Sequence, residues 1–169
     1  MKKRTIITIA CCALALFALV GCTQETQVLE RPPALTVRAD DASVNAWRGS
    51  SEWQTASRGT ASDHVHPLDA MEEMTPLACT PGATVTLVFE TAAPDSVSVR
   101  AWSEDLWDEE EAESSAVPCT LTEEEDGTWS LVLNDEDALY EIRANWTSDD
   151  RYGGHATYAF VTTNRDTQA

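Results

Sequence analysis

The chain has 169 residues and a formal net charge of −18, with 29 acidic residues against 11 basic ones. Three of the basic residues stand at positions 2–4, which leaves 8 for the rest of the chain, all of them arginine. A charge this negative argues against nucleic acid as a partner and against docking on anionic lipid head groups. Six tryptophans and a regular alternation of apolar with polar residues indicate a folded domain rather than a disordered acidic chain.

The first 22 residues have the pattern of an export signal. The cations at 2–4 precede an uncharged run from Ile6 to Val20, which is too short to span a bilayer. The run ends in Leu19-Val20-Gly21-Cys22, which resembles the lipobox of bacterial lipoproteins. The resemblance implies cleavage after Gly21 and a thioether-linked diacylglycerol on Cys22. Two acyl chains anchor a protein stably, so we expect it at the extracytoplasmic face of the cell membrane. A soluble secreted protein with an incidental Cys22 is the alternative.

Four segments follow from this pattern. We expect a lipoprotein signal peptide over 1–21, then the lipidated Cys22 and a flexible tether over 22–33, which contains the paired prolines Pro32 and Pro33. Residues 34–163 are the size of one ordinary domain and can bury a core. Residues 164–169 form a C-terminal tail.

Short runs of alternating apolar and polar residues predict strands through most of the domain. They lie at 34–40, 83–90, 95–102, 127–133, 138–147 and 155–163. The segment 44–56 has a tryptophan on each side of Arg48-Gly49-Ser50-Ser51, which predicts a hairpin with its turn at 48–51. Residues 69–74 are the single stretch expected to be helical, for about one turn. Seven or more short strands separated by turns predict an all-β sandwich or barrel.

One short motif favours a sandwich. Glu136 stands four residues before Tyr140, Ala138 two before it and Ile142 two after it. This spacing resembles the tyrosine corner of immunoglobulin-type sandwiches, with Glu in place of the usual Asp and Ile in place of a cysteine. The resemblance implies that the Tyr140 hydroxyl caps the backbone of the preceding turn. An ordinary strand with an inward tyrosine is the alternative.

A wider resemblance covers most of the domain. The runs "HPLD", "VTLVFE…PDSVSVRAW" and "LYEIRANW…YGGHATYAF" are similar to a group of small Gram-positive lipoproteins with an immunoglobulin-like domain. The resemblance implies an immunoglobulin-like antiparallel β-sandwich and implies no activity. Many members carry a cysteine shortly before the "HPLD" equivalent, whereas residues 62–66 here contain none. No disulfide role therefore transfers to that region.

Two cysteines, Cys79 and Cys119, belong to the exported domain, because Cys11 and Cys12 leave with the signal peptide. An even pair in an oxidisable compartment predicts a disulfide. Closing a loop of about 40 residues would stabilise the fold by about 4 kcal/mol on the chain-entropy model. Two reduced, buried thiols are the alternative.

The segment "SDHVHPLD" is a candidate metal site. His64 and His66 project to the same side of an extended segment, because side chains alternate along it. The side chains that could complete a zinc or copper site with them are Asp63, Asp69 and His155. The alternative is a polar connection in which Pro67 and Leu68 pack against the core.

Residues 103–115 form an acidic insertion between strands. A calcium loop needs alternating ligands and a turn glycine, and the run has no glycine, so a solvated loop is expected. Trp102 and Trp107 flank its start. Trp102 alternates to the opposite face from Val99 and Ala101, so we expect it exposed, and with Trp107 it is our candidate binding surface. Core packing is the alternative for the tryptophans.

The sequence contains no G-x-S-x-G nucleophile elbow, no H-E-x-x-H zinc motif and no glycine-rich phosphate-binding loop. We therefore expect a non-catalytic protein-binding module at the cell envelope, with no cofactor besides the lipid. One alternative is a carbohydrate- or peptidoglycan-binding module, which requires at least two exposed, coplanar tryptophan rings. The other is a metal-binding lipoprotein that uses His64 and His66.

Overall fold

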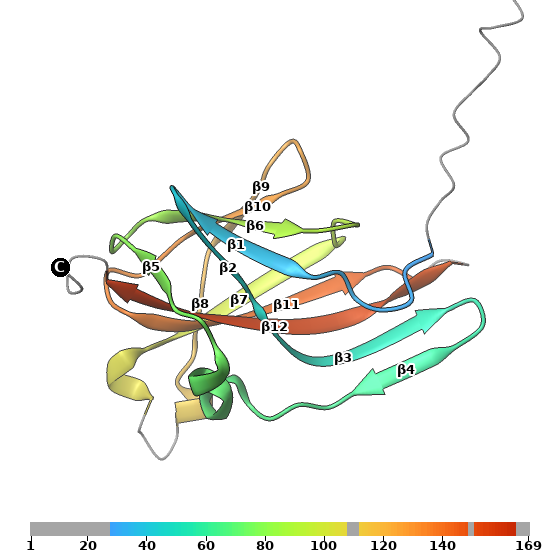
Figure 1. Cartoon of the computed structure of the whole chain (residues 1–169), viewed down its shortest axis with the longest axis horizontal. Coiled ribbons are helices and arrows are strands. Elements are labelled where there is room, and N and C mark those ends of the chain that lie inside the picture. Colours follow the sequence, from blue (N-terminus) through green and yellow to red (C-terminus); the bar gives the residue numbers. More distant parts are fainter. Residues whose placement is uncertain (1–27, 108–111, 149–150, 165–169) are drawn as a thin grey trace, which may run out of the picture.

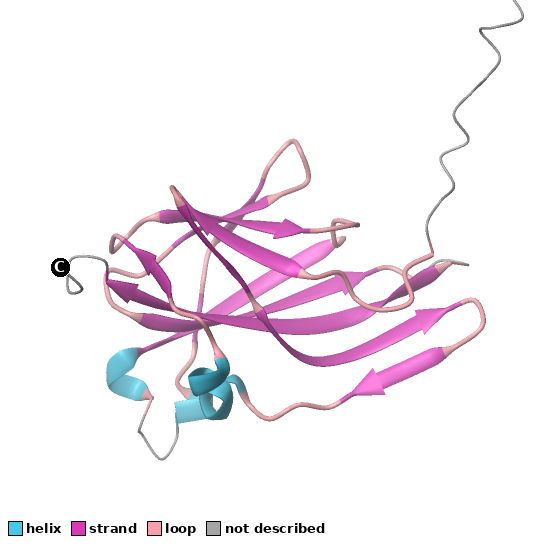
Figure 2. Ribbon diagram, viewed as in Figure 1, coloured by secondary structure: helices cyan, strands magenta, loops and turns pink. Residues whose placement is uncertain are grey.

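The protein folds into two packed β-sheets, as the computed structural model describes for residues 28–107, 112–148 and 151–164 (Figure 1). The predicted all-β architecture is confirmed, since only three short 3-10 helices accompany the strands among the described residues. These helices lie together outside the larger sheet (Figure 2). They are η1 (Pro67–Glu73), η2 (Glu104–Leu106) and η3 (Ala112–Ser114).

The small sheet has five antiparallel strands. In spatial order they are β2 (Ala42–Asn45), β1 (Leu35–Ala39), β6 (Thr84–Phe89), β10 (Trp129–Val132) and β9 (Leu121–Glu123).

The large sheet has seven strands, of which six form an antiparallel series. In spatial order these six are β4 (Gly59–Ser62), β3 (Trp47–Thr55), β12 (Tyr152–Asn164), β11 (Ala138–Trp146), β7 (Ser96–Ser103) and β8 (Val117–Pro118). The seventh strand, β5 (Leu77–Cys79), pairs in parallel with the end of β12.

The main core fills the space between the sheets. Alternation sends every second residue of a strand inward, so the predicted apolar faces meet there. Leu87 and Leu131 come from the small sheet, and Tyr140, Ile142 and Phe160 come from the large one. The rings of Tyr140 and Phe160 are stacked, with their centroids 4.8 Å apart. The alternation in the sequence thus predicted the inward face of these strands correctly.

The predicted hairpin turn at 48–51 is wrong. Residues 47–55 form one continuous strand, β3, and the turn lies between Thr55 and Arg58, whose backbones exchange two hydrogen bonds. Gly49 is needed for close approach, because a Cβ there would lie 2.4 Å from Thr157 Oγ1 on β12. Trp47 and Trp53 therefore share one strand instead of standing on two arms.

The folded part begins earlier than the predicted boundary at residue 34. Pro32 and Pro33 are buried, and the Pro33 carbonyl accepts a 2.6 Å hydrogen bond from the buried Tyr158 hydroxyl. Leu29 packs against the core, and its carbonyl accepts a hydrogen bond from Trp53 Nε1 at 2.8 Å. Residues 29–33 are thus part of the domain rather than of a flexible tether.

Several predicted features lie outside the described residues. These are the signal peptide over 1–21, the lipid site Cys22, and residues 165–169 of the tail. In the described part of the chain, no helix has the length and apolar character needed to cross a membrane.

Candidate functional site on the outer face of the large sheet

The outer face of the large sheet is divided into two halves. In the covered half, β7, β11 and β12 present an apolar cluster made of Trp102, Leu139, Ala159 and Val161. Helix η1 and Met74 close over this cluster, with Trp107 packed beside it. The open half carries polar side chains of the same strands and has no such cover among the described residues.

Trp102 is fully buried, with 0 % of its surface exposed, so its predicted role in a binding surface is wrong. Its Nε1 donates to the Ala112 carbonyl at 2.7 Å, and its own carbonyl accepts from Trp107 Nε1 at 3.1 Å. The predicted alternation was correct, but the chain after β7 folds back and covers this side of the sheet. Trp107 is half-buried.

The acidic insertion is only partly the solvated loop that its charge predicts. Its two ends form η2 and η3, and Ala112 of η3 is buried. Residues 108–111 lie outside the described part of the chain.

The two histidines of "SDHVHPLD" contact different aromatic rings. His66 caps η1, since its Nδ1 accepts from the Leu68 backbone N–H at 3.3 Å, and its ring meets Trp102 edge-on at 5.3 Å. His64 meets Trp47 edge-on at 5.6 Å. Asp69 lies exposed in η1, and His155 lies in β12. Among the described residues, no group of three or more histidine, cysteine, aspartate or glutamate side chains could hold a metal ion.

The open half consists of rows of neighbouring residues on adjacent strands. Arg143 of β11 lies opposite Ser98 of β7 and Thr157 of β12. In the next row, the guanidinium of Arg100 pairs with the carboxylate of Glu141. Arg100 also lies 4.8 Å from the ring of Trp102, so this pair stands on the border of the covered half. Arg100 and Arg143 both line a hollow of about 420 Å³ on this face.

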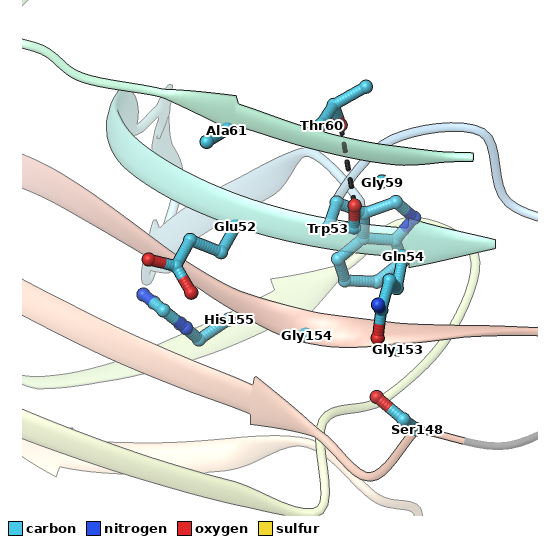
Figure 3. Close-up of a pocket in the computed structure, with 10 residues that line it drawn as sticks. All are labelled: Glu52, Trp53, Gln54, Gly59, Thr60, Ala61, Ser148, Gly153, Gly154 and His155. Carbon is cyan, nitrogen blue, oxygen red and sulfur yellow. Dashed lines mark hydrogen bonds between the residues drawn. The ribbon is translucent and has the colours of Figure 1, made fainter.

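A second hollow, of about 500 Å³, lies where β12, β3 and β4 meet (Figure 3). Small residues make the space, because Gly59 and Ala61 of β4 and Gly153 of β12 line it. A Cβ on Gly153 would lie 2.3 Å from the Ser148 Cα, so glycine is required there. The polar side chains that line it are Glu52, Gln54, Thr60, Ser148 and His155.

Glu52 and His155 occupy facing positions in this hollow. They are cross-strand neighbours on β3 and β12, and their side chains point toward each other in Figure 3. They do not form an ion pair, since the Arg100–Glu141 contact is the one found within the described residues. The sequence pattern placed His155 among the possible metal ligands and did not single out Glu52. Predicting this neighbourhood would have required the pairing of β3 with β12, which in turn requires β3 to be one continuous strand.

No disulfide joins Cys79 and Cys119, both of which lie in the described part of the chain. Cys79 ends β5, Cys119 directly follows β8, and three strands of the large sheet separate β5 from β8. Burial raises the pKa of the Cys119 thiol. The disulfide stays a prediction, which thiol labelling tests.

Tyr140 makes the type of contact that a tyrosine corner requires. Its hydroxyl accepts a hydrogen bond from the Asn134 backbone N–H at 2.7 Å. Burial raises the pKa of Tyr140 to about 12, although the bond from Asn134 acts in the opposite direction. Glu136 is exposed, and the buried Ala138 N–H donates to Thr162 Oγ1 at 2.9 Å.

The open half can therefore form hydrogen bonds and charge contacts with a partner. It offers hydroxyl groups, an amide, an imidazole and charged groups of both signs on a rigid sheet, as protein interfaces do at their polar rims. No family model, curated protein or solved structure matches this chain.

Proposed function

We propose that this protein is a lipid-anchored lipoprotein of the cell envelope whose immunoglobulin-like β-sandwich binds a partner protein. The partner would contact the open half of the large sheet. The observation that carries the anchoring is the Leu19–Cys22 motif at the end of an uncharged run. A diacylglycerol on Cys22 would bury two acyl chains, each gaining about 0.8 kcal/mol per methylene, which is enough for a stable anchor.

The strand order supports the immunoglobulin-like assignment. Such sandwiches have strands A, B, E and D in one sheet and G, F and C in the other, and variable-type domains add C′ beside C. The small sheet has this order if β1, β6, β10 and β9 are A, B, E and D. The large sheet has it if β12, β11, β7 and β8 are G, F, C and C′. The segment β2–β5 is then an insertion between A and B, and Tyr140 stands near the start of F.

The composition of the open half supports binding as its role. Arg143, Ser98 and Thr157 form an exposed or half-exposed polar row, and Glu141 is already engaged by Arg100. We propose the open half as the contact surface in place of the surface expected around Trp102, because Trp102 is buried.

The two alternatives receive less support. A carbohydrate-binding module needs two exposed, coplanar tryptophan rings, and each of the six tryptophans is buried or half-buried. A metal-binding role needs a third ligand near His64 and His66, and the imidazoles contact separate rings instead.

Expression of the full chain in a bacterial host, with a radiolabelled fatty acid supplied, tests the anchoring. The wild type is expected to carry the label and to sediment with membranes. Cys22→Ser is expected to lose both properties, while Cys119→Ser keeps them. A wild type without label would disprove the anchoring.

A photo-crosslinking residue at Ser98 tests the contact surface in intact cells. We expect a discrete crosslinked partner from Ser98, and a weaker product when Arg143→Glu is introduced beside it. The control is the same residue at Val132, which is exposed on the small sheet. Equal products from Ser98 and Val132 would remove the open half as the contact surface.

A further inference from the structure

The strand β4 forms one edge of the large sheet. Within the described part of the chain it pairs only with β3, and all four of its residues are exposed. They are Gly59, Thr60, Ala61 and Ser62, with neither charge nor proline among them. The exposed stretch continues as far as Val65, of which 58 % is exposed. The β3–β4 hairpin extends away from the helices (Figure 1).

The hydrogen-bond pattern leaves two residues of β4 with outward-facing backbone groups. Thr55 and Arg58 exchange two backbone hydrogen bonds at the turn. Because bonded and non-bonded pairs alternate in an antiparallel ladder, the pairs formed by Thr60 and Ser62 are also bonded. The N–H and C=O groups of Gly59 and Ala61 therefore point to the free edge.

The other edges of the two sheets are better protected. Pro118 interrupts the edge strand β8, β9 carries Glu123, and β2 lies against β5. Charge, proline and cover are the usual means by which proteins prevent an edge from pairing with another chain. The edge of β4 has none of them within its four residues, which is the condition for accepting an extra strand.

The hollow beside β4 indicates the chemistry of that strand. Glu52 lies opposite Ala61 on the neighbouring strand and lines the hollow, with no ion pair to another described residue. A strand added to β4 would lie two strand spacings, about 10 Å, from β3. A lysine or arginine of that strand could lie across Gly59 and Ala61, which are too small to block it, and reach the Glu52 carboxylate.

We propose that the free edge of β4 binds an extended segment of a partner protein as an added strand, and that Glu52 pairs with a lysine or arginine of that segment. The proposal rests on the proposed function, because it names where and how the binding module holds its partner. The net charge of −18 is consistent with it, since a negative field speeds the approach of a basic segment.

Binding of synthetic peptides to the full chain, measured by fluorescence anisotropy, tests the proposal. The probe is an acetylated and amidated heptapeptide of alternating threonine and lysine. A second peptide has the same charge and a proline at its centre, so it cannot continue a backbone ladder. A third has glutamate in place of lysine. This set separates strand addition from plain attraction between a basic peptide and an acidic protein.

We expect the alternating lysine peptide to bind at least tenfold more tightly than its proline counterpart. Ala61→Pro should abolish that difference, because it removes an outward N–H while leaving the ladder with β3 intact. Glu52→Gln should weaken the lysine peptide about fivefold, whereas the matched Glu123→Gln on the small sheet should not.

Three results would overturn the proposal. One is equal binding of the proline and alternating peptides, and a second is no binding at millimolar peptide. The third is a homodimer of the full chain that Ala61→Pro dissociates, since a second copy would then occupy the edge. These outcomes are independent of the fatty-acid label on Cys22, so a failure here leaves the anchoring intact, and the reverse also holds.

Discussion

The two halves of the outer face belong to the same strands and follow the same alternation, yet one is buried and the other faces solvent. On β11, the outward residues run from Leu139 in the covered half through Glu141 to Arg143 in the open half. Leu139 packs against the cluster around Trp102, whereas Arg143 is exposed. The change from apolar to charged within one strand marks where the cover ends.

This difference shows what alternation can and cannot predict. A period of two assigns each residue to one of two faces, but it does not state whether a face has a cover. On the inner face the second sheet always supplies the cover. On the outer face, helix η1 and the chain after β7 supply it for only part of the length.

The largest expected effect is a difference in labelling rate between the two thiols. Cys79 is buried in the main core, whereas Cys119 is half-exposed at the border of the large sheet. We expect a maleimide to modify Cys119 at least about 100-fold faster than Cys79 in the folded protein, since a core thiol reacts only after the fold opens.

Labelling of the unreduced protein also tests the predicted disulfide. Two labelled cysteines after denaturation without reductant would exclude the bond between Cys79 and Cys119. Labelling that requires reductant would establish it, and would mean that β5 and the segment after β8 approach each other more closely than in this structure.

The comparison predicts a large stability difference between substitutions on the two halves. Trp102→Ala should lower the free energy of unfolding by about 3–5 kcal/mol, because it leaves a large cavity under η1. Arg143→Ala should change it by less than about 0.5 kcal/mol, because the side chain is exposed. Urea denaturation of both variants measures the difference. Similar losses for the two would mean that the open half is covered as well.

Tyr140→Phe tests how much a buried polar contact on the inner face contributes to stability. The variant removes the acceptor of the Asn134 N–H, and we expect a loss of about 1–2 kcal/mol in the free energy of unfolding. In the covered half, Leu139, Ala159 and Val161 have no polar side-chain group and therefore no such contact to lose.

The raised pKa of Tyr140 also predicts a pH dependence. The folded protein holds the phenolic proton to about pH 12, while the ordinary pKa is 10.0. The resulting stabilisation is complete below pH 10 and is lost as the pH rises through 12. Burial also raises the pKa of Tyr158, so wild-type stability should fall steeply above pH 10. Tyr140→Phe should fall less steeply in denaturation curves at pH 9 to 11.5, and an equal slope would contradict this.

Much of the fold was predictable from the sequence because the inner face obeys a local rule. The alternation of apolar and polar residues predicted which side chains of six strands point inward, and these side chains form the main core. The six strands are β1, β6, β7, β10, β11 and β12. The hairpin at 48–51 failed for a non-local reason. Gly49 looks like a turn residue in the sequence, but its role is to let β3 approach Thr157, which is more than 100 positions away.

The candidate site was less predictable for the same reason. Glu52 and His155 become neighbours only through the pairing of β3 with β12. The burial of Trp102 depends on residues after β7 whose acidic composition predicts a solvated loop. Neither contact leaves a periodic signal in the sequence.

A substitution at His66 should weaken the cover that η1 forms over the covered half, with a smaller effect than Trp102→Ala. His66→Ala removes the Nδ1 acceptor that caps η1 at Leu68, with an expected loss of about 1 kcal/mol. His66→Asn retains an acceptor and should recover part of the loss. His64→Ala is the control, because His64 is exposed and caps no helix. Trp fluorescence during urea denaturation reports both stability and the exposure of Trp102. An equal loss from His64→Ala would exclude capping as the cause.

The smallest expected effect is at the border itself, where Arg100 pairs with Glu141. A double-mutant cycle of Arg100→Gln and Glu141→Gln should give a coupling energy below about 1 kcal/mol, since Arg100 is 44 % exposed and solvent screens such pairs. The coupling should fall further in 1 M NaCl, where the Debye length is about 3 Å. A coupling of several kcal/mol that resists salt would place the pair in a water-excluded environment. The cover would then extend past Trp102, and the open half would begin only at Arg143.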